Sequence, residues 1–136
     1  MSRQPIVLDT NIVLDLLVFD DPAAGPLKAA LAAGDLRWLA TPAMRDELAR
    51  VLDYPKIAPR LAFYGRAASA VLAAFDAQAE PADVAPRAPL TCQDPDDQKF
   101  IDLAVAHRAQ LLSKDRAVLC MKKRLEVHAV WTSVAI

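Results

Sequence analysis

Two aspartates stand at or just beyond the ends of short apolar runs, where a buried strand would end. Asp9 ends the run at 6–8, and Asp115 comes soon after the run at 111–112. In an open α/β sheet, ligands bind at the carboxyl ends of the strands, so we expect both carboxylates to face a crevice. A carboxylate beside so much apolar sequence is costly unless another group pairs with it.

Two further acids are predicted to reach the same edge of the sheet. Glu47 lies beside the apolar stripe of a predicted helix over 42–52. Asp97 opens a later helix just after Asp94 and Asp96, and either of these could replace it as the third acid of the site. Convergence of acids from four separate segments would be more informative than any one of them.

Four carboxylates in one small hollow would favour a metal site. At separations of ~4–6 Å they repel one another by several kcal/mol, even at an effective dielectric constant of ~20. They raise one another's pKa unless divalent cations neutralise them. Oxygen ligands without His or Cys favour Mg²⁺ or Mn²⁺. One or two such ions can activate water and stabilise the leaving oxygen of a phosphodiester, so we predict metal-dependent phosphodiester hydrolysis.

Each acid also has a structural alternative. Asp97 and Asp115 could cap the helices that follow them. Glu47 could pair with Arg50 or Lys99. A purely structural role is least convincing for Asp9, because this residue directly ends a buried strand.

Small polar residues beside the acids are candidate auxiliary groups. Thr10 and Asn11 could cap the first helix, or they could orient Asp9 or a metal-bound water. Ser113 could orient Asp115 in the same way, or simply end a strand. The chain has no nucleophile elbow, no Cys/His pair and no glycine-rich phosphate loop, so covalent catalysis is not supported.

The bulk composition bounds the class of protein. The 136 residues fit a single domain over 1–136, and 54% of them are hydrophobic while only 6% are aromatic. The net charge of −1 argues neither for nor against nucleic acid. Two distant cysteines favour a reduced state. With no signal peptide and no run of ~20 apolar residues, we expect a cytoplasmic protein that does not bind membranes.

Strands that alternate with helices predict an α/β fold, a three-layer α/β/α sandwich with a central, mainly parallel sheet. Strands are predicted at 6–8, 36–40, 111–112 and 126–131, with a short one around Val84. Helices are predicted at 11–19, around 27–31, at 42–52, at 59–78 with a kink near Gly65, at 97–109, and from after Asp115 to about Leu119. Lys122-Lys123-Arg124 is predicted as a basic turn.

The whole pattern resembles the PIN domain family, metal-dependent ribonucleases found in many bacterial toxin–antitoxin toxins. The matching segments are IVLDTNI at 6–12, RDELARVLDYPKI at 45–57, DPDDQKFIDLA at 94–104 and LLSKDRAVL at 111–119. Their order and spacing are specific, and they span nearly the whole chain. They are most similar to the subgroup of toxin components, the VapC-like ribonucleases.

The resemblance implies a pocket for one or two Mg²⁺ or Mn²⁺ ions at the edge of a parallel sheet. It also implies a homodimer and a small antitoxin that fills or covers the pocket. The residues that match the family's four acids, followed by its auxiliary groups, are Asp9, Glu47, Asp97, Asp115, Asn11 and Ser113.

Single-stranded RNA is the substrate class that the resemblance implies. Lys114, Arg116 and Lys99 lie near the motifs in the sequence and are candidates for phosphate contacts. One alternative is a non-catalytic PIN-fold module that binds RNA or protein. A phosphoryl-accepting signalling domain is disfavoured, because Asp9 has no adjacent acid.

Overall fold

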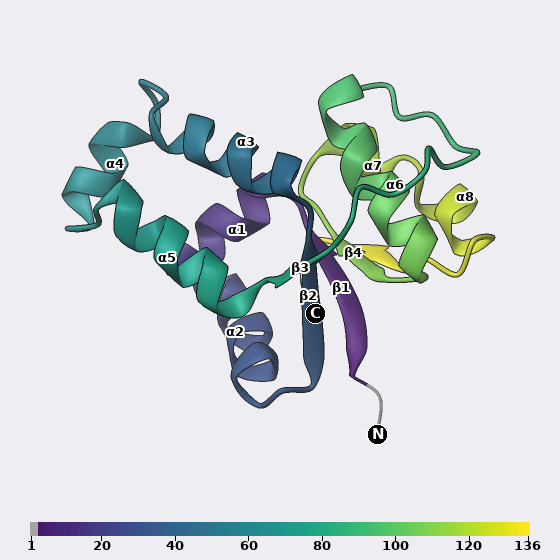
Figure 1. Ribbon diagram of the computed structural model, residues 1–136, viewed down its shortest axis with the longest axis horizontal. Coiled ribbons are helices and arrows are strands. Elements are labelled where there is room, and N and C mark those ends of the chain that lie inside the picture. The colour runs from purple at the N-terminus through teal and green to yellow at the C-terminus, as the bar shows by residue number, and fades with distance from the viewer. Residues whose placement is uncertain (1–2) are drawn as a thin grey trace.

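Parallel strands form the centre of the protein, whose computed structural model describes residues 3–136 (Figure 1). The sheet has the strand order β3-β2-β1-β4-β5, and every neighbouring pair in it is parallel. The strands are β1 (Gln4–Leu8), β2 (Leu36–Ala40), β3 (Glu80–Pro81), β4 (Gln110–Leu112) and β5 (Thr132–Ser133). The predicted α/β sandwich is therefore confirmed.

Helices cover both faces of the sheet. Figure 1 shows α1 to α5 on one side and α6 to α8 on the other. They are α1 (Thr10–Leu17), α2 (Gly25–Ala32), α3 (Pro42–Leu52), α4 (Ala58–Phe63), α5 (Ala68–Gln78), α6 (Gln98–His107), α7 (Arg116–Leu119) and α8 (Lys122–Glu126), with 3-10 turns at Pro22–Ala24 and Pro95–Asp97. Within residues 3–136, no helix has the length and apolar character needed to cross a bilayer.

The central strand β1 determines where the polar edge lies. Ile6, Val7 and Leu8 are buried between the two helical layers, which explains their uninterrupted apolar run. Leu8 is in register with Leu112 of β4, and the Asp9 N–H donates to the Leu112 carbonyl at 3.0 Å. Because the two strands are parallel, the residues that follow them are brought together at one edge.

The segment predicted as one helix over 59–78 with a kink near Gly65 is helical, but it forms two separate helices and not one kinked helix. α4 and α5 are separated around Gly65, whose φ of 64° is in the left-handed region that favours glycine. The strand predicted around Val84 is also wrong: β3 lies earlier, at Glu80–Pro81, and Val84 is an exposed residue of the connector.

The last predicted strand, over 126–131, is wrong as well. Met121 and Leu125 are both buried and four residues apart, which is helical spacing, so α8 includes the residues predicted as a basic turn. Val127 is exposed and Ala129 has a φ of 60°, which together interrupt an extended run there. Strand β5 therefore begins only at Thr132.

Candidate active site

Asp9 is buried at the carboxyl end of β1, with 2% of its surface exposed. Its Oδ1 accepts a hydrogen bond from the Ile12 N–H at 3.0 Å, so it caps α1, and its Oδ2 accepts one from the Ser113 hydroxyl. Burial raises the pKa of Asp9 above its ordinary value, although both hydrogen bonds oppose the rise. The Ser113 oxygen also accepts from the Asp115 N–H at 3.0 Å, so Ser113 ties two of the predicted acids together.

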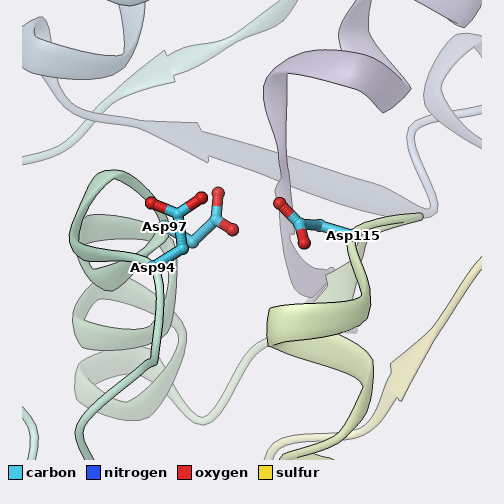
Figure 2. Close-up of side chains that lie close together, drawn as sticks. All are labelled: Asp94, Asp97 and Asp115. Atoms are coloured by element: carbon cyan, nitrogen blue, oxygen red, sulfur yellow. The ribbon is translucent and has the colours of Figure 1, made fainter.

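A second group of carboxylates lies where α6 and α7 begin. Figure 2 shows Asp94 and Asp97 pointing across a gap toward Asp115. One oxygen from each of the three lies within 4.8 Å of the others, which is a separation that a shared cation would bridge. Of the three candidates for the third acid, Asp94 and Asp97 belong to this group, whereas the exposed Asp96 lies outside it and lines the neighbouring cleft.

Asp97 and Asp115 share a proton when no cation is present. Burial, then the hydrogen bond and repulsion from Asp115, then repulsion from Asp94 and Asp9 together raise the pKa of Asp97 to about 8. The same hydrogen bond, with the Ala117 N–H, lowers the pKa of Asp115. At neutral pH Asp97 is therefore the protonated partner, and it donates to the Asp115 carboxylate.

Helix capping explains the positions of only some of these acidic residues. Asp115 accepts a hydrogen bond from the Ala117 N–H at 2.9 Å and so caps α7, which is the structural role predicted as its alternative. Asp94 caps the 3-10 turn through the Asp96 N–H at 3.0 Å. Asp97 makes no capping hydrogen bond, and its Oδ2 is a buried oxygen without a hydrogen-bond partner among residues 3–136. Capping therefore does not account for Asp97.

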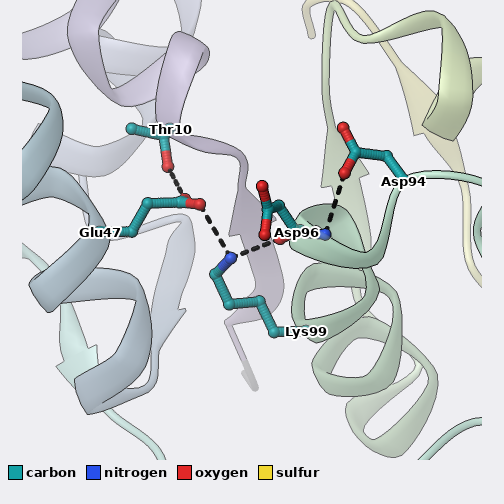
Figure 3. A network of polar contacts seen from close by, with 5 residues as sticks. All are labelled: Thr10, Glu47, Asp94, Asp96 and Lys99. Atoms are coloured by element: carbon teal, nitrogen blue, oxygen red, sulfur yellow. Dashed lines mark hydrogen bonds and ion pairs between the residues drawn. The ribbon is translucent and has the colours of Figure 1, made fainter.

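Glu47 is held in a separate network on the other side of the cleft, which Figure 3 shows. The Thr10 hydroxyl donates to its Oε2, and the Lys99 ammonium donates to its Oε1 at 2.9 Å. Lys99 also donates to the Asp96 carbonyl. Of the two ion-pair partners predicted for Glu47, Lys99 is therefore the correct one and Arg50 is not.

One cleft connects the two groups of acids. It has a volume of about 200 Å³, and its polar lining residues are Asp9, Thr10, Asn11, Glu47, Asp96 and Asp97. Neither Asp9 nor Glu47 belongs to the three-carboxylate group within 4.8 Å. The four predicted acids therefore gather at one edge of the sheet but do not meet at a single point.

The three basic residues predicted to contact RNA differ in whether they already form ion pairs within the protein. Lys99 is committed to Glu47, and Lys114 forms an ion pair with Asp15 of α1. Arg116 is exposed at the start of α7. Contacts of all three with RNA remain predictions.

A positioning network behind Asp94 was not predicted. The Gln98 side chain accepts from the Cys92 N–H at 2.7 Å and donates to the Leu90 carbonyl at 2.9 Å and to Asp102 Oδ1 at 2.8 Å. Asp102 also accepts from the Ala88 N–H at 2.9 Å. The four-residue spacing of Gln98 and Asp102 on one helix face was the only sequence signal for this clamp, which holds the connector that leads to the acids.

The donor set fits a hard divalent cation. The candidate ligand atoms are all carboxylate oxygens, which Mg²⁺ and Mn²⁺ prefer over softer ligands. The unpartnered Oδ2 of Asp97 and the proton that Asp97 shares with Asp115 are both features that a cation would replace. The residues present therefore match such an ion.

The comparisons with known proteins bear on the family and the fold of the chain. A family model described as PIN domain matches residues 5–117. No curated protein matches the chain. Among solved structures, the chain is similar in fold to the crystal structure of VapBC2 from Rickettsia felis bound to a DNA fragment from their promoter, with a TM-score of 0.63 and 15% identity over 96% of this chain and 98% of that one. Because the family model covers most of its length, the chain belongs to the PIN domain family, a family of nucleases.

Proposed function

We propose that the protein is a Mg²⁺- or Mn²⁺-dependent endoribonuclease, and that it is the toxin of a toxin–antitoxin pair. The observation that carries the proposal is the group formed by Asp94, Asp97 and Asp115, in which Asp97 has a buried, unpartnered oxygen. Asp9 and Glu47 complete an acidic cleft beside it.

The residues that would hold one or two ions are Asp9, Glu47, Asp97 and Asp115, with Asp94 or Asp96 as the alternative to Asp97. When bound, such an ion supplies an activated water and stabilises the charge that develops on the leaving oxygen of a phosphodiester. Hydrolysis of the bond to the 3′-oxygen would leave a 5′-phosphate and a 3′-hydroxyl.

The protein's own contribution is to hold the carboxylates in place. The Ser113 hydroxyl orients Asp9, and the Thr10 hydroxyl orients Glu47. Asn11 lines the cleft from the first turn of α1, where its amide can contact a phosphate oxygen or a water. Such preorganised side chains need not reorganise during the reaction.

The proposed partners follow from the family and the solved complex. The solved structure with a similar fold is that of VapBC2 from Rickettsia felis, bound to a DNA fragment from their promoter. By analogy we propose a cognate antitoxin for this chain, together with a homodimer and a cytoplasmic location.

The test is a ribonuclease assay with and without Mn²⁺ or Mg²⁺, on the parent protein and on Asp9→Asn, Asp97→Asn and Asp115→Asn. We expect metal-dependent cleavage by the parent and losses of about 100-fold or more in the variants, as for removal of a group that stabilises transition-state charge. Asp83→Asn is the matched control, because Asp83 is exposed and lies in the connector. Equal cleavage by all variants would refute the proposal.

One observation favours a second candidate function. The Lys99 ammonium already neutralises Glu47, so this half of the cleft is stable without a metal ion. A non-catalytic PIN-fold module that binds RNA or protein would need no more than this. Calorimetric titration distinguishes the two candidates, because the module predicts no heat of Mn²⁺ binding.

A further inference from the structure

A second pocket opens beside the candidate active site and shares a wall with it. It has a volume of about 510 Å³ and lies between α1 and α4. Asn11 lines both this pocket and the acidic cleft. Lys114, another lining residue, directly follows Ser113, whose hydroxyl is bonded to Asp9. A ligand that occupies the acidic cleft can therefore extend into this pocket.

An arginine stacked on an aromatic ring forms one wall of the pocket. The Cζ atom of Arg60 lies 3.7 Å from the centroid of the Phe19 ring, and the Phe19 and Tyr64 rings are 5.9 Å apart at 51°. Arg60 is exposed, and no carboxylate among residues 3–136 forms an ion pair with it. Its guanidinium is thus held by the ring while its charge and its N–H donors stay available.

The acids in the pocket do not neutralise Arg60. Asp15 is paired with Lys114. Asp21 accepts a hydrogen bond from the Ala23 N–H at 2.9 Å and caps the 3-10 turn that follows it. Neither carboxylate pairs with the Arg60 guanidinium, although Asp21 keeps its own negative charge, so Arg60 is the one cation of the pocket without an ion-pair partner among residues 3–136.

We infer that this pocket binds one nucleotide of single-stranded RNA next to the bond that is cut, an inference that rests on the proposed ribonuclease function. Unstacked RNA bases stack on aromatic rings and on arginine guanidinium planes. In this pocket a base would stack against Arg60 and Tyr64, while the guanidinium edge would donate to a flanking phosphate. Because stacking requires no base-edge readout, the subsite would accept different bases with modest preferences.

The inference is tested by fluorescence anisotropy with a 5′-fluorescein RNA decamer of mixed sequence, in Ca²⁺ to limit cleavage. Arg60→Ala and Tyr64→Ala should each weaken binding about tenfold, the effect typical of losing one stacked base. Arg60→Lys keeps the charge but loses the plane, so it should recover less than half of the lost affinity. Arg66→Ala is the matched control, an exposed arginine that does not line the pocket, and should bind like the parent.

A set of probes with one abasic residue separates stacking from charge. At one position the abasic probe should bind the parent about tenfold more weakly. With that probe Arg60→Ala should cause a smaller loss than with the other probes, because only the phosphate contact is left to lose. If Arg60→Ala lost the same affinity for every probe, or if Arg60→Lys bound RNA as tightly as the parent, the nucleotide subsite would be overturned in favour of a general phosphate contact.

Failure of this inference can be distinguished from failure of the proposed function. A parent protein that cleaves RNA with Mn²⁺, but whose Arg60 and Tyr64 variants bind RNA normally, would overturn only the subsite. If those variants instead lost self-association in sedimentation experiments, the pocket would be a protein contact. A parent that neither binds nor cleaves RNA would overturn both.

Discussion

Lys99 and Glu47, 52 positions apart in the sequence, form an ion pair of 2.9 Å across the acidic cleft. The pair joins α6 to α3 and is largely shielded, with side-chain exposures of 25% and 15% (Figure 3). An ammonium thus occupies one side of a carboxylate that is a candidate metal ligand. The cation that balances Glu47 in the metal-free protein is supplied by the chain itself.

Replacing this lysine should tighten metal binding. In Lys99→Met, Glu47 loses its internal cation, so we expect Mn²⁺ affinity to rise roughly three- to tenfold, a discounted value because the pair is partly exposed. Isothermal titration calorimetry measures the change. Lys28→Met, which breaks the exposed pair with Asp20, is the control and should leave the affinity unchanged. Weaker Mn²⁺ binding by Lys99→Met would show that Lys99 supports the metal site instead of competing with it.

The stability of the metal-free protein should fall as pH rises toward 8. The pKa of Asp97 is raised from 3.8 to about 8, so between these values the folded state holds a proton that the unfolded state has released. Stability is full below the unfolded pKa, decreases through this window and is level above about 8. The raised pKa of Asp9 acts in the same direction. The lowered pKa of Asp115 changes stability only below the ordinary carboxyl pKa, so it leaves this slope unaltered. Because Asp97 and Asp115 titrate as a pair, we expect a discounted net loss of about 1–3 kcal/mol.

Urea denaturation in EDTA at pH 5, 7 and 8.5 measures this slope. Asp97→Asn removes the titrating carboxyl and should make the profile flatter, with greater stability than the parent at pH 8.5. Asp83→Asn, at an exposed position, should keep the parent's slope. A parent whose stability increases with pH over this window would contradict the assigned protonation of Asp97.

Loss of the Ser113 hydroxyl should be costly despite its small size. Ser113→Ala leaves the buried Oδ2 of Asp9 and the Asp115 N–H without their shared partner, so we expect a loss of about 1–3 kcal/mol of stability at neutral pH. Thermal or urea unfolding measures it. Ser133→Ala, which removes only a bond to the Ala135 carbonyl near the end of the chain, should cost clearly less. Equal effects would mean that Ser113 does not tie the acids together.

The hydrogen bonds of Gln98 and Asp102 should keep the connector, and the acids that follow it, well ordered. Gln98→Leu removes its three hydrogen bonds to the connector and Asp102, which should increase hydrogen exchange over 86–96 and weaken Mn²⁺ binding several-fold through Asp94. Gln78→Leu, at an exposed position of α5, is the control. Exchange over 86–96 that stayed at the parent's rate would show that the connector is held by other contacts.

The centre of the fold and its acidic edge could be predicted from the sequence because both are encoded locally. The run that ends at Asp9 is apolar without interruption, as a strand buried on both faces must be, and the acid marks its end. The segment at 126–131 was mispredicted because Val127, Val130 and Trp131 suit a strand. The buried spacing of Met121 and Leu125 instead favours a helix just before it.

The rest of the site depends on tertiary distances that no local pattern contains. The sequence offered Arg50 and Lys99 as partners for Glu47, and only the packing of α6 against the cleft decides between them. The stack of Arg60 on Phe19 likewise requires α4 to fold back over the end of α1. The gathering of the acids into two adjacent groups, and not one, is also a property of the folded chain.

The most direct test of a metal-dependent active site is a calorimetric titration of the parent protein with Mn²⁺ at pH 7, in two buffers of different ionisation enthalpy. The comparison yields the number of protons released for each ion bound. Because the pKa of Asp97 is about 8, we predict that binding releases about one proton, and that Asp97→Asn binds far more weakly without this release. The absence of binding, or unchanged binding and proton release in Asp97→Asn, would contradict the proposed metal centre.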